Sequence, residues 1–311
     1  MKVTFGIEQA SFVARSVATL GSYDGLHLGH QDILKTLLAK QKEHNYSRSI
    51  VLTFDPHPQE ILKKNNSAIK LLTTLDERLD ILQTTGVDEV IVIAFSKEFS
   101  QTPYSEFFKN TLVGKLGIAA MVVGSNHAFG KNREGDVQHL ESLAAEVGVA
   151  VTEVPPYLVD GVHISSTKIR TALAEGHIDT VTRYLGREYQ LSGMVTGGDK
   201  IGRTLGYPTI NLKIAENKLL PKDGVYAGTA ILNDGREVMA AISVGTRPTI
   251  TDSNERLTEA FLLHFSGDLY DQRISLRLSH FLREQIAFDS LEALQIQIKK
   301  DVSDIEALMA L

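Results

Sequence analysis

The sequence predicts an α/β domain with a parallel sheet, followed by a small antiparallel β-domain that ends in a helix. The chain has 311 residues, and because a domain commonly takes about 150 residues, two domains are expected. The first half alternates short β-branched runs with helical patterns, which is typical of a parallel sheet with crossover helices. After about Tyr184 the pattern changes to short strands separated by turns, which indicates an antiparallel barrel or sandwich. We therefore expect one domain over residues 1–185 and a second over residues 186–311.

Short apolar runs in the first half are the expected strands of the parallel sheet. They span residues 17–20, 50–54, 89–95, 120–124 and 149–154. Leucines at helical spacing follow His30, and a second helical pattern runs from Leu75 to Leu82. In an open α/β sheet, ligands bind beyond the carboxyl ends of the strands. The loops after the first, second and fourth of these strands are therefore expected to converge on one crevice.

The second half carries a hairpin signal and a clear final helix. The Asn-Asp-Gly turn at residues 233–235 separates two strand patterns, as expected for antiparallel neighbours. Asp289 and Glu292 have the spacing of a helix capping pair. An apolar stripe then continues from Leu291 to Ile305. We expect this helix to begin at the capping pair and to pack on the β-domain.

The composition is that of a globular protein without a general affinity for nucleic acid. Hydrophobic residues make up 43% of the chain and the formal net charge is −6, so no basic field attracts nucleic acid. The lack of cysteine excludes disulfides and thiolate metal sites and suits a reducing compartment. The N-terminus has no signal-like apolar core, and no apolar run is long enough to cross a bilayer. We expect a cytoplasmic protein with small-molecule partners, no nucleic-acid partner and no membrane association, and the sequence leaves its oligomeric state open.

The first chemically informative segment, at Gly21–His30, reads GSYDGLHLGH. It follows a strand pattern and precedes a helical one, and the N-terminal amides of such a helix attract phosphate. His27 and His30 can donate ring N–H groups to phosphate oxygens, and the Asp24-Gly25 turn lets the backbone approach a ligand. Taken alone, the two histidines are equally well explained as ordinary helix-start residues.

The second informative segment, at Gly197–Leu212, reads GGDKIGRTLGYPTINL. Its glycines alone are typical of an ordinary turn between strands. The ordered Pro-Thr-Ile-Asn that follows places Thr209 and Asn211 on alternate residues, and hence on one face of a strand. Hydroxyl and amide oxygens are hard ligands of the kind that Mg²⁺ accepts.

Four segments of the first half together resemble the adenylyltransferase half of the bacterial bifunctional riboflavin kinase/FAD synthetases. They are GSYDGLHLGHQDIL from residue 21, TFDPHP at 53–58, VVGSNHAFGKNREGD at 122–136 and ISSTKIR at 164–170. The resemblance implies an α/β Rossmann-like nucleotidyltransferase domain in which His27 and His30 hold the phosphates of ATP. It also implies a set of residues that bind the nucleotide or line the flavin crevice. These are Gly21, Asp24, Gly25, Phe54, Pro56, Pro58, Gly124, Asn126, Ser166, Thr167 and Arg170.

The segment from Gly197 to Leu212 resembles the riboflavin kinase signature, a glycine-rich turn followed by Gly-x-Pro-Thr-x-Asn. The resemblance implies a small antiparallel β-barrel with a C-terminal helix, in which Thr209 and Asn211 bind the Mg²⁺ that bridges ATP oxygens. The residues implied to surround the nucleotide are Gly197, Gly202, Arg203, Gly206 and Pro208.

Glu259 is the candidate base for a reaction that starts from an alcohol. Phosphoryl transfer to a hydroxyl calls for a group that accepts its proton, and a carboxylate within reach can do so. Strand alternation places Glu259 and Phe261 on one face, where a charge among apolar neighbours is uncommon without a role. The surrounding TEAFLLHFSGDLY resembles the family segment whose glutamate is the catalytic base. The alternative is a rim glutamate paired with Arg256 or Arg273.

The chain departs from the family pattern at several positions. Ser22 and Tyr23 stand where Asn and Phe are usual, His127 and Ala128 replace a commonly aromatic and basic pair, and Phe261 and His264 replace His and Asp. His57, between two prolines, is interpreted as a surface histidine, with a contact to phosphate as the alternative.

The resemblance implies an enzyme that converts riboflavin to FMN and FMN to FAD, with ATP as substrate and Mg²⁺ as cofactor. Because the departures fall in the first crevice and near the candidate base, two alternatives stay open. One is a paralogue that retains only one activity, and the other is a flavin-binding regulator without turnover.

Overall fold

The computed structural model describes residues 1–310 except 63–68, 127–129, 131–134, 198–205 and 247–255. Its contacts divide the chain into two compact units, Met1–Ser166 and Thr167–Leu311. Within the described residues, no helix has both the length and the apolar character needed to span a membrane.

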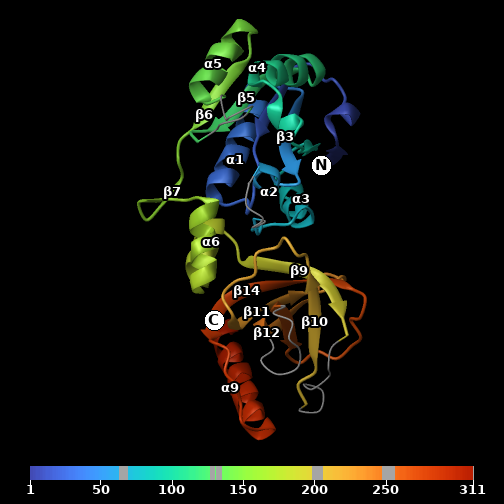
Figure 1. Ribbon diagram of the computed structural model, residues 1–311, viewed down its shortest axis with the longest axis vertical. Coiled ribbons are helices and arrows are strands. Elements are labelled where there is room, and N and C mark those ends of the chain that lie inside the picture. Colours follow the sequence, from blue (N-terminus) through green and yellow to red (C-terminus); the bar gives the residue numbers. More distant parts are fainter. Residues whose placement is uncertain (63–68, 127–129, 131–134, 198–205, 247–255, 311) are drawn as a thin grey trace. The chain divides into compact units, whose positions relative to one another are not determined.

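The first unit is built on a six-stranded parallel sheet, as the sequence predicted (Figure 1). Its strands are β1 (Lys2–Phe5), β2 (Ser16–Leu20), β3 (Arg48–Asp55), β4 (Glu89–Ala94), β5 (Ile118–Gly124) and β6 (Ala150–Val154). The spatial order is β1-β4-β3-β2-β5-β6, and all of these pairs are parallel. Only β1 was missed, because a four-residue edge strand carries too short a pattern to recognise.

Helices cover both faces of this sheet, because the strands alternate between two apolar clusters. Val17, Val51 and Val90 pack with Leu34 and Leu37 of α1 (Leu28–Glu43) and Leu82 of α3 (Leu75–Gln83). The intervening strand residues form the other cluster with the π-helix η3 (Phe107–Lys115) and α5 (Val137–Glu146). A strand buried on both faces therefore reads as a continuous apolar run, as parallel strands do.

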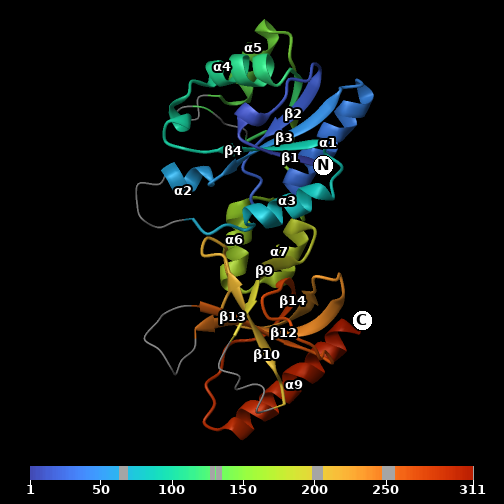
Figure 2. The same cartoon turned by 90° about the vertical axis from the view of Figure 1, so that its right-hand side faces the viewer.

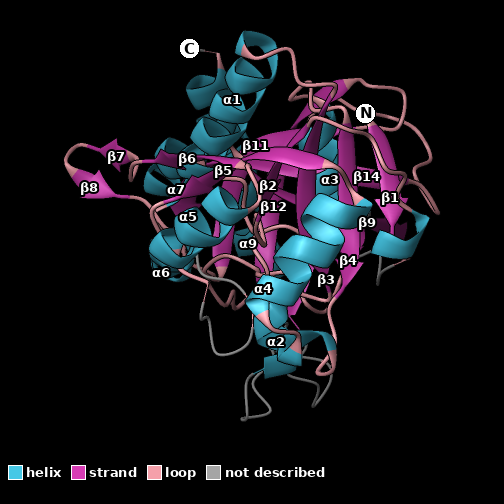
Figure 3. Ribbon diagram, turned by 90° about the horizontal axis from the view of Figure 1, so that it is seen from above, coloured by secondary structure: helices cyan, strands magenta, loops and turns pink. Residues whose placement is uncertain are grey.

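Short elements complete the first unit. They are η1 (Ile7–Gln9), α2 (Pro58–Leu62), η2 (Phe99–Gln101), α4 (Tyr104–Glu106), β7 (Leu158–Val159) and β8 (Val162–His163). The last two form a two-stranded antiparallel hairpin, which Figure 3 shows at the margin beyond β6.

The strand order reverses beside β2, and this reversal positions the first site. From β2 the chain moves to β3 and β4 on one side, and β5 and β6 lie on the other side. In a doubly wound sheet such a switch point opens a crevice beyond the carboxyl ends of the strands. The segment that follows β2 at this point is Gly21–His30.

The second unit is a closed antiparallel barrel with helices before and after it (Figure 2). Its elements are α6 (Ser166–Glu175), α7 (Ile178–Leu185), β9 (Tyr189–Thr196), β10 (Thr209–Ile214), β11 (Gly224–Ile231), β12 (Glu237–Thr246), β13 (Arg256–Leu262), β14 (Arg273–Arg283) and α9 (Leu291–Met309). The barrel order is β10-β13-β12-β11-β14-β9. The predicted turn between β11 and β12 is confirmed, with Gly235 at φ +83°, a left-handed conformation that glycine favours.

The last helix packs on the outside of the barrel, as expected. Figure 2 shows α9 in red alongside the strands, and its Ile305 packs with Ala227 and Leu263. The predicted cap was wrong by one residue: Ser290, not Asp289, is the N-cap, and its hydroxyl accepts a hydrogen bond from the Ala293 amide at 3.1 Å. The helix thus begins at Leu291, and a serine hydroxyl serves as well as a carboxylate for the amide at this position.

Candidate functional site

His27 joins the strand-end loop to helix α1. It is the N-cap of α1, and its Nδ1 accepts a hydrogen bond from the His30 amide at 3.3 Å. The two imidazole rings stack with their centroids 3.7 Å apart. Because Nδ1 is the acceptor, the neutral ring carries its proton on Nε2 and is a hydrogen-bond donor there. Both predicted histidines therefore lie together at the amino end of a 16-residue helix, where its dipole favours an anion.

The loop before His27 adopts an unusual left-handed backbone. Tyr23, Gly25 and Leu26 have φ of +51°, +86° and +41°. The Tyr23 side chain is buried, and its hydroxyl lies 2.5 Å from Thr19 Oγ1. Burial raises the pKa of this hydroxyl, and the Thr19 bond opposes the rise. The tyrosine that replaces the usual phenylalanine thus has an internal hydrogen-bond partner, and the loop keeps a buried aromatic anchor.

Asp24 and Ser166 hold this loop in place. The Asp24 carboxylate is buried and accepts the Thr73 amide at 3.0 Å, and the Gly25 amide donates to Thr73 Oγ1 at 2.9 Å. The Ser166 hydroxyl donates to the Asp24 carbonyl at 3.0 Å. Ser166, which is predicted to bind the nucleotide, is therefore bonded directly to Asp24 in the loop that carries His27.

Arg78 is a residue of this region that the sequence analysis missed. Its side chain is fully buried, and Nη1 lies 2.9 Å from the Ser22 carbonyl, 2.8 Å from Thr53 Oγ1 and 3.1 Å from the Phe54 carbonyl. Burial lowers its pKa, while the charges of Asp24, Asp55 and Glu60 act in the opposite direction. In the sequence, Arg78 directly precedes Leu79 of the predicted helical stripe. An arginine at such a position is more simply interpreted as exposed to solvent, so the pattern did not indicate a buried residue.

The loop after β3 supplies the second predicted wall. Phe54 is buried against Phe95, with ring centroids 5.4 Å apart in an edge-to-face arrangement. Pro56 follows it, and Pro58 is the first residue of α2. His57 was interpreted as a surface residue and this is wrong: it is buried, and its Nδ1 accepts the Gln59 amide at 3.1 Å. This bond ties the His57 ring to the first turn of α2.

The remaining predicted residues of the first site are spread over β5 and α6. Gly124 is the last residue of β5, and Asn126 is exposed in the turn that follows. Thr167 and Arg170 lie in the first turns of α6. His127 and Ala128, where the chain departs from the family pattern, lie outside the described residues.

The barrel register brings the predicted base and metal ligands together. On β13, Glu259 lies directly opposite Asn211 of β10 on one side and Ser243 of β12 on the other. Thr209 lies opposite Phe261 in the same pairing. Directly opposite residues have Cβ atoms about 5 Å apart. Glu259 is therefore a cross-strand neighbour of Asn211, and Ser243 joins this group without having been predicted.

This group belongs to the outer face of the barrel. Thr258 and Ala260 of β13 are buried, whereas Glu259 and Phe261 between them are only partly buried. Phe261 packs with α9 residues and against Tyr207, at 5.3 Å between ring centroids. The aromatic pair of Phe261 and Tyr207 therefore lies next to the candidate base, because Phe261 is two residues after Glu259 on the same face of β13.

The glycine-rich turn is only partly within the described residues. Gly197 follows β9, Gly206 has φ +82°, and Pro208 precedes β10. Gly202 and Arg203 lie outside the described residues.

Arg256 is one of the two arginines that the rim alternative offers as a partner of Glu259. Arg256 Nε donates to Asp223 at 2.7 Å, and Arg256 also contacts the Pro221 carbonyl. Arg256 therefore has a carboxylate partner in Asp223.

Comparison with protein families gives two matches that follow one another along the chain. The FAD synthetase family matches residues 10–168 and the riboflavin kinase family matches residues 185–309. The residues between these matches, 169–184, belong to α6, α7 and the two-residue turn between them.

Relatives with assigned names match nearly the whole chain. A protein of Haemophilus influenzae is 33% identical over 308 residues, which are 99% of each chain. One of Escherichia coli is 34% identical over 97% of this chain and 96% of its own. One of Listeria monocytogenes is 35% identical over 94% and 92%. All three are named bifunctional riboflavin kinase/FMN adenylyltransferase.

A solved structure from Streptococcus pneumoniae, titled macrolide-efflux protein, has a TM-score of 0.88 at 27% identity and covers 97% of this chain and 98% of its own. Its title differs from the names of the sequence relatives, but its fold covers both units. The two family matches and the full-length relatives agree with the α/β sheet and the barrel described above. The chain belongs to the bifunctional riboflavin kinase/FMN adenylyltransferase family.

Proposed function

We propose that this protein phosphorylates riboflavin to FMN in its barrel and adenylylates FMN to FAD in its α/β unit. The observation that carries the proposal is the barrel register, in which Glu259 is the cross-strand neighbour of Asn211. A protein that only stores flavin needs neither a base nor a metal ligand beside it.

In the kinase reaction, Glu259 accepts the proton of the terminal ribityl hydroxyl of riboflavin. The resulting oxygen attacks the γ-phosphorus of ATP, and the bond to the ADP oxygen breaks. Thr209 and Asn211 offer a hydroxyl and an amide oxygen from one strand face, a donor set that fits Mg²⁺. Magnesium, when bound there, neutralises phosphate charge. Phe261 and Tyr207 give the flavin ring an aromatic surface.

In the adenylyl transfer, an FMN phosphate oxygen attacks the α-phosphorus of ATP and pyrophosphate leaves. This nucleophile is already ionised near neutral pH, so positioning and charge stabilisation supply most of the rate. His27 and His30 donate to the ATP phosphates at the amino end of α1. Asp24 and Ser166 keep the loop in its left-handed form.

We assign FMN adenylylation to the segment that matches the FAD synthetase family and riboflavin phosphorylation to the segment that matches the riboflavin kinase family. We propose that the boundary between these two functional domains lies at residues 185/186. By contacts, α6 and α7 belong to the unit that contains the barrel. We further propose the cytoplasm as the compartment, because the chain has no cysteine and both reactions consume ATP.

The test is to incubate the purified protein with riboflavin, ATP and Mg²⁺ and to separate FMN and FAD by chromatography over time. Both products are expected, with FMN preceding FAD. FMN without FAD means a paralogue that retains only the kinase, and neither product means a flavin-binding protein.

The metal proposal has its own test. Chelation with EDTA should stop riboflavin phosphorylation, and added Mg²⁺ should restore it. Thr209→Val with Asn211→Leu should raise the Mg²⁺ concentration needed for half-maximal rate. Turnover that persists after chelation contradicts the metal role of these two residues.

A further inference from the structure

The two segments that form the predicted walls of the first crevice both contact one buried side chain, that of Arg78. Ser22 lies in the loop after β2, and Phe54 lies at the end of β3. Arg78 Nη1 contacts both of their carbonyls, at 2.9 and 3.1 Å, and also Thr53 Oγ1 at 2.8 Å. The Thr53 hydroxyl in turn donates to the Ser22 carbonyl at 3.2 Å. The contacts of one guanidinium nitrogen thus set the spacing between the two walls.

The other two nitrogens of Arg78 differ from Nη1 in the part of the chain that the structure describes. Among the described residues, Nε and Nη2 are buried and have no hydrogen-bond partner. Buried donors without acceptors destabilise a fold, and an apolar side chain of similar volume is often at least as stable in such a place. Packing alone therefore gives no reason for an arginine here. Violations of this kind are expected mainly at functional sites.

The helix that carries Arg78 is itself well anchored. Thr74 caps α3 in a reciprocal capping box with Glu77, and Thr73, directly before the cap, bonds to Asp24 and Gly25. The amino end of α3 therefore holds the loop at Asp24, and Arg78, one turn later, holds it at Ser22. The loop continues into His27 and His30.

From these contacts we propose that Arg78 is a positioning residue of the adenylyltransferase site, which locks the β2 loop against the end of β3. It holds the loop that carries His27 at the spacing from Phe54 and Pro56 that ATP and FMN need. The inference rests on the proposed function, because it assigns Arg78 to the alignment of those two substrates.

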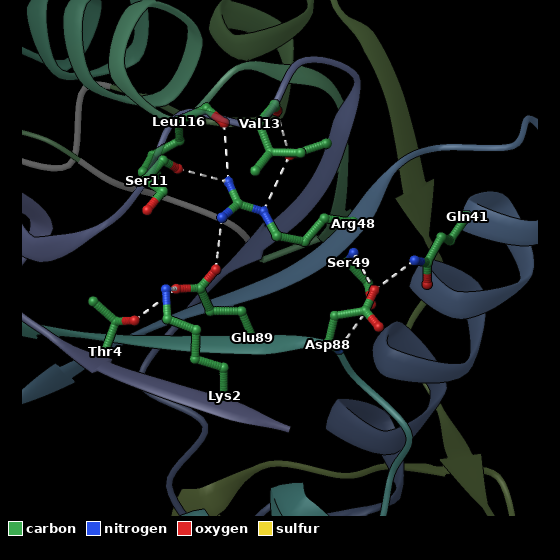
Figure 4. A network of polar contacts seen from close by, with 11 residues as sticks. Lys2, Thr4, Ser11, Val13, Gln41, Arg48, Ser49, Asp88, Glu89 and Leu116 are labelled. Carbon is green, nitrogen blue, oxygen red and sulfur yellow. Dashed lines mark hydrogen bonds and ion pairs between the residues drawn. The ribbon is translucent and has the colours of Figure 1, made fainter.

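A second buried arginine, Arg48, lies on β3, the strand whose Thr53 and Phe54 Arg78 contacts, and it provides a matched control. Arg48 is the first residue of β3, whereas Phe54 and Asp55 end it. Figure 4 shows the Arg48 side chain among its partners: Nη1 binds Glu89 at 2.6 Å, and Nη2 binds the Ser11 and Leu116 carbonyls. Its Nε also donates to Ser16 Oγ at 3.3 Å. Arg48 is thus fully paired at the amino end of the sheet, away from the crevice.

The experiment compares Arg78→Met, Arg78→Lys and Arg48→Met in the full chain. For each, the KM for ATP in FAD formation from supplied FMN, the rate of riboflavin phosphorylation and the thermal midpoint of the first unit are measured. A loss of folded protein lowers Vmax but leaves KM unchanged, so KM separates positioning from stability.

Of the two methionine variants, Arg78→Met should have the larger effect on the KM for ATP, and Arg48→Met should have the larger effect on the thermal midpoint. Arg78→Met should raise the KM for ATP by about 10- to 100-fold, in line with the cost of misplaced substrates, and lower the thermal midpoint less than Arg48→Met does. Arg48→Met should lower the midpoint more and leave KM near the wild-type value. The KM of Arg78→Lys should lie between those of wild type and Arg78→Met. An ammonium can still bond to the two carbonyls, but it lacks the planar fork of a guanidinium. Riboflavin phosphorylation, a reaction of the barrel, should be unchanged in all three.

A wild-type KM in Arg78→Met, or an equal rise in both methionine variants, overturns the inference while the proposed function stands. Wild-type protein that forms no FAD from FMN overturns the adenylyltransferase proposal and this inference together.

Discussion

His27 performs two tasks with one ring, and the two can be separated by substitution. Its Nδ1 caps α1 by accepting the His30 amide, and the remaining nitrogen is the proposed phosphate donor. Asparagine also accepts the amide hydrogen bond of a helix N-cap, but it lacks the imidazole. Replacement by asparagine should therefore remove only the proposed phosphate contact, whereas replacement by alanine should remove both that contact and the helix cap.

His27→Asn should keep the thermal midpoint close to that of wild type while FAD formation from FMN falls about 100-fold, the cost of removing one donor to developing charge. His27→Ala should lose the same activity and also about 1 kcal/mol of stability with the cap. Rates of FMN adenylylation and denaturant melts measure the two effects. An asparagine variant with wild-type FAD formation contradicts the phosphate role of His27.

Glu259→Gln should lower riboflavin phosphorylation at least about 100-fold, because the amide cannot accept the hydroxyl proton. FAD formation from supplied FMN should be retained. Glu237→Gln is the matched control: Glu237 begins β12 of the same barrel and pairs with Arg277 at 3.0 Å in an exposed position. Such surface pairs contribute little, so this variant should phosphorylate riboflavin normally. Equal losses in both variants refute the base assignment.

At the scale of elements, a buried ion pair joins three strands at the amino end of the parallel sheet (Figure 4). Glu89 of β4 binds Arg48 of β3 at 2.6 Å and Thr4 of β1 at 2.6 Å, and Lys2 of β1 at 2.9 Å. Burial alone raises the pKa of Glu89, but the bonds from Thr4 and Lys2 and the charge of Arg48 outweigh it, so the pKa lies below its ordinary value of 4.5.

This depressed pKa predicts the acid response of the first unit. The contribution of Glu89 to stability is present above the ordinary value of its pKa and is lost as the pH falls through the lower folded value. Glu89→Gln should therefore be less stable at pH 7, by about 2 kcal/mol, and should lose less further stability on acidification. Chemical denaturation at several pH values measures both. Glu146→Gln, which removes an exposed pair with Lys109, should parallel wild type; a Glu89→Gln curve that also parallels wild type contradicts the assignment.

The molecule as a whole carries two reactions on two compact units, Met1–Ser166 and Thr167–Leu311. FMN is the product of one reaction and the substrate of the other. If each reaction depends on its own residues, two chains with complementary defects should together make FAD.

His27→Asn should convert riboflavin to FMN with little FAD, and Glu259→Gln should convert riboflavin to neither product. A mixture of the two variants should form FAD, because FMN released by the first can diffuse to the second. Time courses by chromatography measure this. A mixture that forms no FAD, although each variant retains its own reaction, contradicts independent sites.

The sequence by itself determined the order of the main elements and the family to which the two signatures belong. β-branched runs and turn residues are local properties, so most strands, the Asn-Asp-Gly turn and the last helix could be predicted. The same patterns mark His27, Glu259, Thr209 and Asn211 as candidate reactive residues, and the substitutions above test them. The cap at Ser290 was missed because neighbouring residues compete for the same amide and the sequence pattern fits both.

Only the tertiary structure decided which residues meet. Strand register pairs Glu259 with Asn211 and Ser243, and folding of α3 onto the sheet buries Arg78 beside Ser22 and Phe54. These contacts join segments far apart in the chain, and their energies depend on burial and hydrogen-bond geometry that no local pattern encodes. For that physical reason the sequence could indicate candidate reactive residues, whereas the buried neighbours of those candidates could not be predicted from it.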